Sequence, residues 1–320
     1  MSVPAVPATP GELASARRGH RSAANRDRPP AGTSRTAGYF FVALYVSLLL
    51  LIGVAPVVYA IYLALSKPTG LGQSGGFGSA FLAAVNDYRF VSALEHVVEF
   101  MVLWLGGQTI IVVGLTLTIH NLAPRVGAAF RFLFYLPGAL AGAASVVVWL
   151  FMLDPTASPF AFILHWLGFA QFDSTIAPAH LPEIFAIMAF WTGAGGWIVV
   201  MYGALNNIPL ELLESAQIDG VSTLKTALWI KLPLIRKWVV YMLILSFAGG
   251  TQLFVEPTVL STASVGVGVS NYWSPNQLAW FVASQYDDYS EAAAISVILL
   301  VLGLIVAAVL VWRGRLFEVG

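Results

Sequence analysis

The 320-residue chain contains no cysteine and few charged residues. The absence of cysteine excludes disulfide bonds, thiolate metal sites and cysteine nucleophiles. Charged residues make up 10% of the chain, whereas a soluble domain has about a quarter. Hydrophobic residues make up 58%, and a water-soluble fold cannot bury that much apolar surface. The composition therefore predicts one membrane domain, and the net charge of zero gives no indication of a nucleic-acid partner.

Residues 1–37 differ from the rest of the chain because they show no apolar period. They are rich in Pro, Ala and Ser and contain a group of arginines: Arg17, Arg18, Arg21, Arg26, Arg28 and Arg35. This composition predicts a disordered basic tail. The apolar run that follows, from Tyr39 to about Leu65, is too long for a signal-peptide core. It is predicted to be the first transmembrane helix, with a kink at Pro56.

Five further apolar runs are each close to the length of about 20 residues that crosses a hydrocarbon core. They cover roughly residues 100–119, 132–153, 184–205, 238–255 and 292–312. The runs are continuous rather than alternating, which favours helices over the strands of a barrel. The predicted fold class is an all-α membrane protein with six transmembrane helices. The first helix and its outer loop occupy residues 38–94, and residues 316–320 form a short tail.

The basic residues predict the orientation of the chain. Lys and Arg near the ends of spans are retained on the cytoplasmic side of a membrane. With the N-terminus inside, only Lys67 and Arg89 of the 16 Lys and Arg fall on the outer side. The sequence therefore predicts a multi-pass protein whose N- and C-termini are both cytoplasmic.

The loop between the fourth and fifth spans, residues 206–237, contains two short helical patterns. Pro209 suits a first helical turn, Gly220 suits the left-handed residue that ends a helix, and Ser222 suits the cap of a second helix. Pro233 ends this second helix or opens the fifth span. One face of the first helix is expected to be apolar, with Leu212, Leu213 and Ala216. Amphipathicity alone favours an interfacial helix that only anchors the loop.

The spacing of residues in this loop resembles a known signature. The run is Glu214-Ser215-Ala216, three residues, Gly220, nine residues, Ile230, one residue, and Leu232-Pro233. It resembles the EAA signature of binding-protein-dependent ABC importer permeases, with Ser215 in place of the usual Ala. Asp219 before Gly220 is similar to the Asp-Gly pair of the carbohydrate-uptake branch, which includes the maltose and glycerol-phosphate transporter permeases.

Weaker motifs extend the resemblance from about Leu94 to Arg315. They are Arg131-Phe132 with Tyr135-Leu136-Pro137, Phe254-Val255-Glu256-Pro257, and Tyr289 with Glu291-Ala292-Ala293-Ala294. One segment departs from the branch, because residues 261–270 stand where a Gly-Gly-Pro turn is common. This departure weakens the inference about the solute and leaves the inference about the loop intact.

The resemblance implies the architecture of a type I ABC importer permease, with residues 95–315 as the permease core and a cytoplasmic coupling helix between the fourth and fifth spans. It implies a second permease subunit, usually a distinct chain, two ATPase subunits and an extracytoplasmic solute-binding protein. The solute is expected to be a sugar or a similar polar molecule, and the location is the plasma (inner) membrane of a prokaryote. The residues assigned to ATPase coupling are Glu214, Ser215, Ala216, Asp219, Gly220, Ile230, Leu232 and Pro233.

The energy source is expected in another chain. None of Lys67, Lys225, Lys231 and Lys237 follows a glycine, so this sequence builds no phosphate-cradling P-loop. ATP and Mg are therefore expected in the partner ATPase subunits, and no cofactor, metal or catalytic residue is assigned to this chain.

A polar solute needs polar groups inside the helix bundle, where ionisable side chains are costly. Gln252 and Glu256, one turn apart, are the candidates for the solute path. Alternatively, Glu256 lies hydrated at the outer interface. Tyr272 and Trp273 could stack on sugar rings, although Tyr and Trp also collect at membrane interfaces.

Two other classes of protein remain as alternatives. A membrane-embedded enzyme would use His96 with Glu95 and Glu99, but their order is not that of the HExxH zinc motif. A secondary transporter would more often show an internal repeat and charges near the bilayer midplane. Neither is evident in the sequence, so an ABC importer permease is the favoured reading.

Overall fold

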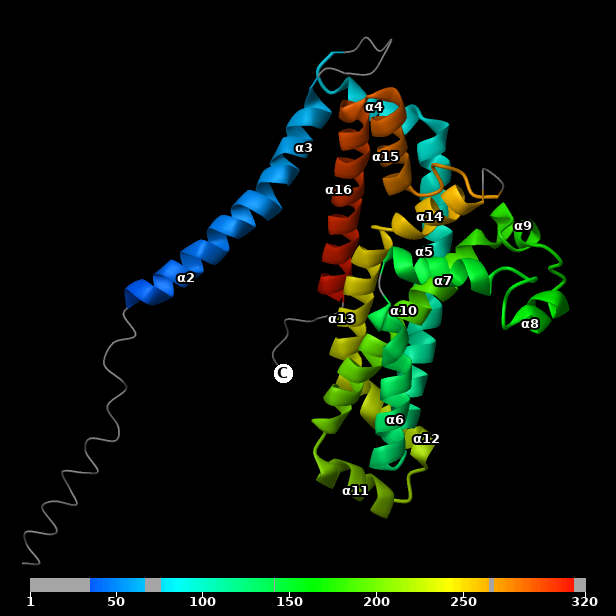
Figure 1. Ribbon diagram of the computed structural model, residues 1–320. Coiled ribbons are helices and arrows are strands. Elements are labelled where there is room, and N and C mark those ends of the chain that lie inside the picture. The colour runs from blue at the N-terminus through cyan, green and yellow to red at the C-terminus, as the bar shows by residue number, and fades with distance from the viewer. Residues whose placement is uncertain (1–34, 67–75, 141, 265–267, 314–320) are drawn as a thin grey trace, which may run out of the picture. The chain divides into compact units, whose positions relative to one another are not determined.

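The computed structural model describes residues 35–66, 76–140, 142–264 and 268–313, and every regular element in these ranges is a helix (Figure 1). The basic tail up to residue 34, Lys67 and the predicted tail at 316–320 lie outside the described residues. The chain forms two compact units, residues 1–58 and 59–320. Of the segment predicted to hold the first span and its outer loop, 38–94, the described residues 59–66 and 76–94 lie in the second unit.

The first unit contains α2 (Arg35–Leu48), the π-helical stretch η1 (Leu49–Val54) and the start of α3 (Ala55–Leu65). Every described side chain from Tyr39 to Val58 in this unit is exposed. The π-helical stretch ends two residues before Pro56, where the sequence predicts a kink. Proline has no amide N–H to donate to the preceding turn, and widening that turn is one way a helix accommodates it.

The second unit holds the remaining helices. They are α4 (Ser79–Asn86), α5 (Tyr88–His120), α6 (Pro124–Tyr135), η2 (Leu136–Ala139), α7 (Ala143–Met152), α8 (Ala161–Trp166), α9 (Phe172–Thr175), η3 (Pro178–His180), α10 (Leu181–Asn206), α11 (Leu210–Ile218), α12 (Thr223–Lys225), η4 (Thr226–Lys231), α13 (Leu232–Gly250), α14 (Val255–Ala263), α15 (Pro275–Tyr286) and α16 (Tyr289–Arg313). Figure 1 shows α11 at one end of this unit and α4 and α15 at the other. We name these the α11 end and the α15 end.

Four helical segments of the described chain are long and apolar enough to cross a membrane: Val42–Leu65, Tyr88–His120, Pro178–Asn206 and Tyr289–Arg313. Two bent pairs also qualify: Pro124–Ala139 with Ala143–Met152, bent by 104°, and Thr223–Gly250 with Val255–Ala263, bent by 42°. The described residues thus contain four spans, or up to six if each bent pair is one span. The third apolar run, expected to be one continuous helix, is instead broken before α7, where Gly142 has φ +64°.

The second span begins earlier than the sequence indicated. Helix α5 starts at Tyr88 rather than near Phe100, because the Asp87 carboxylate accepts a 2.8 Å hydrogen bond from the Arg89 amide and caps the helix. Glu95 and Glu99 are therefore exposed residues inside a helix rather than at its start. Polar residues on its outer face hid the first turns of this helix from a hydrophobicity search.

Close packing of α6 and η2 against α10 holds the centre of the unit together. A Cβ added at Gly195 would overlap the Phe134 carbonyl oxygen and lie 2.6 Å from Tyr135 Cα, and one added at Gly138 would lie 2.8 Å from the Thr192 carbonyl oxygen. Such approaches are typical of membrane helices that pack through glycine. Gly195 makes the tightest approach, whereas the neighbouring Gly196 has open space at its Cβ position.

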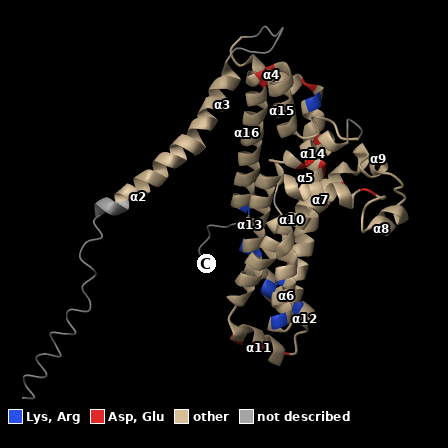
Figure 2. Ribbon diagram, in the orientation of Figure 1, with Lys and Arg blue, Asp and Glu red and all other residues tan. Residues whose placement is uncertain are grey.

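Most of the described Lys and Arg of the second unit gather toward one of its ends. Figure 2 shows Lys and Arg gathered near α6, α12 and the start of α13, at the α11 end. The described basic residues of these segments are Arg125, Arg131, Lys225, Lys231, Arg236 and Lys237. Asp87 joins α4 to α5 and Arg89 lies in the first turn of α5, at the α15 end.

Candidate coupling loop and solute hollows

The loop at the α11 end contains the sharp turn that the sequence predicts. Asp219 caps α11 and Gly220 follows with φ +71°, the left-handed region that glycine adopts without steric cost. The Gly220 amide donates to the Gln217 carbonyl and the Val221 amide donates to the Ala216 carbonyl, both at 3.0 Å. This pair of hydrogen bonds is a Schellman motif, so the last carbonyls of α11 are satisfied and the direction of the turn is fixed.

The two faces of α11 differ in burial. Ala216 is buried, with 5% of its surface exposed. Glu214, Ser215 and Asp219 are exposed, and Ser215 Oγ donates a 3.0 Å hydrogen bond to the Leu212 carbonyl. The loop residues assigned to coupling therefore divide into one that packs inward and three that face away from the bundle.

The exposed face is more apolar than the sequence analysis expected. Leu210 and Ile218 are 66% and 86% exposed, and they lie four residues before and after Glu214, so the three form one stripe along the helix. Leu212, expected to face the bundle, is 41% exposed. Exposed apolar side chains grouped around a charge are typical of a protein contact surface. The i, i+4 spacing around Glu214 is the signal that could have identified this stripe.

The second half of the loop runs without interruption into the fifth span. Ser222 has the extended conformation of a cap, but its side chain makes no capping hydrogen bond. Helix α12 continues through the π-helical η4 into α13, where Pro233 stands in the first turn. Pro233 therefore opens the span rather than ending the loop helix. Ile230 and Leu232 are half-buried and Pro233 is exposed.

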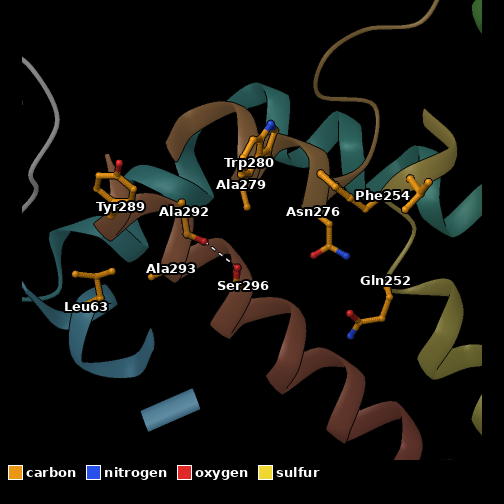
Figure 3. Close-up of a pocket in the computed structure, with 11 residues that line it drawn as sticks. Leu63, Gln252, Phe254, Asn276, Ala279, Trp280, Tyr289, Ala292, Ala293 and Ser296 are labelled. Carbon is orange, nitrogen blue, oxygen red and sulfur yellow. Dashed lines mark hydrogen bonds between the residues drawn. The ribbon is translucent and has the colours of Figure 1, made fainter. Parts of the chain in front are cut away.

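Gln252 lines an open hollow of about 600 Å³ between the ends of α13, α15 and α16. Asn276, Trp280, Tyr289 and Ser296 also line it, and none of the described residues that line it is charged. Figure 3 shows Gln252 and Asn276 on one side of the hollow and Tyr289 on the other. Asn276 Nδ2 donates a 2.9 Å hydrogen bond to the Thr251 carbonyl. The hollow combines amide groups with aromatic rings, which suits an uncharged polar ligand.

Glu256 lines a second, smaller hollow of about 260 Å³, together with Gly138, Gly142, Ser145 and Thr192. This hollow lies where the two bent pairs meet, because Gly142 precedes α7 and Glu256 is in the first turn of α14. Within the part of the chain that the structure describes, no Lys or Arg lines it. Broken membrane helices often form solute sites at such points.

Tyr272 and Trp273 lie elsewhere. Trp273 is 2% exposed, and its ring stacks on His96 at 5.2 Å and meets Phe185 edge-on at 4.6 Å. Tyr272 packs against Phe281. Neither residue lines either hollow. The structure places Trp273 in the core, where it stabilises the α15 end. The aromatic residues that line the larger hollow are Phe254, Trp280 and Tyr289. Asn276 and Trp280 are four residues apart on α15, a spacing that the sequence analysis missed.

Comparison with known proteins identifies the family. No protein-family model matches the chain. It is 24% identical over 283 residues to the arabinooligosaccharides transport system permease protein AraP of Bacillus subtilis, covering 87% of this chain and 88% of that one. It is 28% identical over 213 residues to the sn-glycerol-3-phosphate permease UgpA of Rhizobium meliloti, covering 65% and 71%. The chain is an ABC importer permease.

Other relatives and solved structures agree with this assignment. The permease is 26% identical over 244 residues to the diacetylchitobiose uptake permease NgcF of Streptomyces coelicolor, covering 74% of this chain and 67% of that one. Two structures of a bacterial alginate ABC importer match its fold, with TM-scores of 0.71 and 0.72 at 18% identity. They cover 88% and 89% of the permease, and 96% and 97% of the matched chains. The all-helical membrane fold expected from the sequence is thereby confirmed.

Proposed function

We propose that this permease forms part of the path by which an uncharged sugar, or a similar uncharged polar solute, enters a prokaryotic cell through the plasma membrane. Separate ATPase subunits drive the uptake. The observation that carries this proposal is the α11 turn, a rigid bent element that ends at Gly220 and presents an exposed stripe at the end of the bundle where Lys and Arg gather.

In this proposal α11 is the coupling helix. Leu210, Glu214 and Ile218 contact the ATPase, because their side chains are exposed on one stripe. Ser215 and Asp219, also exposed, border that contact. Ala216 packs against the bundle, and Gly220 sets the turn. The segment from Ile230 through Leu232 and Pro233 carries the motion into α13, because η4 and α13 are continuous. ATP and Mg bind in the ATPase subunits and contact none of these residues.

The same proposal fixes the topology at six spans, each bent pair counting as one, with both termini cytoplasmic. The gathering of Lys and Arg at the α11 end supports this orientation, since basic residues near span ends are retained in the cytoplasm. The α15 end then faces outward, and both solute hollows lie on that side of α11.

The complete importer would contain a second permease subunit, a distinct chain as is usual in this branch, two ATPase subunits and an extracytoplasmic solute-binding protein. One of the matched alginate structures includes an alginate pentasaccharide-bound periplasmic protein. A homologous arrangement would place a binding protein against the α15 end of this permease, with membrane lipid around the exposed apolar helices.

The charges around the hollows favour an uncharged solute. The relatives are named for both kinds: arabino-oligosaccharides and diacetylchitobiose are uncharged, whereas glycerol 3-phosphate and alginate are anions. An anion inside a membrane bundle needs a cationic partner to offset its lost hydration. Among the described residues neither hollow is lined by Lys or Arg, and Glu256 would repel an anion.

The test is uptake by the complete complex reconstituted in liposomes. Radiolabelled arabinotriose, diacetylchitobiose, sn-glycerol 3-phosphate and an alginate trisaccharide are supplied with the binding protein, with ATP or ADP on the ATPase side. We expect ATP-dependent uptake of an uncharged sugar and none of the anions. Preferential uptake of an anion over the uncharged sugars would contradict the proposal of an uncharged solute. Uptake that is independent of ATP, or purification without an ATPase, would instead favour a secondary transporter.

A further inference from the structure

Lys231 is a buried cation within the coupling loop. It is the last residue of the π-helical η4, between Ile230 and Leu232, and only 5% of its surface is exposed. An ammonium group taken out of water is costly unless its protons find acceptors. A methionine of similar length would fill the same space without that cost. The position therefore calls for an explanation beyond packing.

The ammonium is held by two groups at the end of the second span. Lys231 Nζ donates a 2.7 Å hydrogen bond to Asn121 Oδ1 and lies 3.0 Å from His120 Nδ1. An ammonium has donors only, so His120 Nδ1 accepts and the ring proton of the neutral imidazole sits on Nε2. Both acceptors are uncharged, which makes this contact directional and short in range.

The contact continues beyond His120. Its ring lies 5.5 Å from the ring of Tyr202 on α10, and the guanidinium of Arg131 on α6 lies 3.7 Å over the same tyrosine ring. Four elements therefore meet within one cluster: η4, the end of α5, α6 and α10. Lys231 is the member that belongs to the coupling loop.

We propose that Lys231 is a positioning residue, which ties the coupling loop to the ends of the second and fourth spans so that motion of α11 moves those spans together with α13. This inference rests on the proposed coupling function of the loop. Without the tie, α11 would still dock on the ATPase, because Leu210, Glu214 and Ile218 are untouched. Its motion would then reach the bundle only through the chain that joins it to α10 and α13, and the second span would no longer move with the loop. Solute movement would therefore follow hydrolysis less closely.

The first experiment compares Lys231→Met with Lys225→Met in the reconstituted complex. Lys225 is an exposed lysine in the same loop and provides the matched control. Uptake of whichever of the four radiolabelled probes the wild type accepts, and ATP hydrolysis, are measured together. We expect Lys231→Met to lower the solute carried per ATP by about tenfold, a typical size for coupling between sites. The ATPase subunits should still co-purify, and Lys225→Met should behave as wild type.

Variants of Asn121 provide a second experiment. Asn121→Leu removes the acceptor and should reproduce the Lys231→Met defect, and the double variant should be no worse than either single one, because both remove the same contact. Asn121→Asp keeps an acceptor and should retain coupling. Additive losses in the double variant would overturn the proposal, since they would show that the two residues act separately.

A third measurement needs no solute and no wild-type transport. The chain has no cysteine, so nitroxide labels at Leu122→Cys and Leu224→Cys report the distance between the end of α5 and the loop without labelling elsewhere in this chain. We expect a narrow distance distribution with Lys231 and a broad one with Lys231→Met. Equal distance distributions in the wild type and in Lys231→Met would overturn the proposal that Lys231 holds the loop against α5. Failure of the wild type to take up any probe would count against the proposed function, whereas normal coupling in Lys231→Met would count against this inference alone.

Discussion

The side-chain amide of Gln108 donates a 2.7 Å hydrogen bond to the hydroxyl of Ser246 across the buried contact between α5 and α13. Both side chains are buried, and Gln108 Oε1 has no hydrogen-bond partner among the described residues. In the interior of a membrane bundle no water is available to replace a lost partner. The pair therefore fixes the register of the second span against the fifth.

Replacing one member of this pair should cost more than replacing both. Ser246→Ala leaves the Gln108 amide unpaired and should destabilise the permease by about 1–2 kcal/mol. Gln108→Leu combined with Ser246→Ala removes both polar groups and should recover most of that loss. Thermal unfolding in detergent measures the effect, with Thr118→Ala as control, because the Thr118 hydroxyl is exposed and bonds within its own helix. A double variant less stable than Ser246→Ala would contradict this account.

Gly195→Ala should prevent normal packing of α6 against α10. The added methyl would overlap the Phe134 carbonyl oxygen, and neither backbone can withdraw without moving a helix. We expect loss of the monodisperse protein, or a melting temperature lowered by several degrees, corresponding to about 1–3 kcal/mol for an overpacked core. Gly196→Ala, one residue further along the same helix, has open space and should behave as wild type. Equal stability of the two variants would show that this helix contact is not as close as described.

The effect of a substitution at Gly220 should depend on how much free energy the new residue needs to adopt a left-handed backbone conformation. Open space surrounds its Cβ position, so only φ +71° discriminates between side chains. Gly220→Asn should retain coupling. Gly220→Ala should destabilise the folded loop by about 1–2 kcal/mol. Gly220→Pro should abolish uptake while membrane insertion continues. Proline is incompatible with positive φ and removes the amide that bonds to Gln217. Solute-stimulated ATP hydrolysis distinguishes the three, and normal uptake by Gly220→Pro would exclude a coupling role for the turn.

Glu256→Leu should weaken solute binding rather than assembly. A carboxylate that accepts a solute hydroxyl contributes about 1.5–3 kcal/mol, so its loss should raise KM for uptake about tenfold or more. Glu256→Gln keeps an acceptor oxygen, so its KM should lie between that of Glu256→Leu and that of the wild type. Glu99→Gln is the control, because Glu99 is exposed. An unchanged KM in Glu256→Leu would indicate that the carboxylate lies outside the solute path.

The sequence by itself determined the features that depend on a single stretch of chain. Apolar length predicts membrane helices because lipid offers no hydrogen-bond partners. Gly220 predicts a left-handed turn because other side chains are strained there. The spacing from Glu214 to Pro233 predicted the family, since it lies within one loop.

Only the tertiary structure decided which distant residues meet. Trp273 joins the core through His96 and Phe185, and Lys231 reaches Asn121 across 110 residues of sequence. Gln252 and Glu256, four residues apart, line separate hollows because the chain bends between α13 and α14. Such contacts depend on how helices pack against one another, and hydrophobic periodicity records only that a face is buried, not which partner buries it.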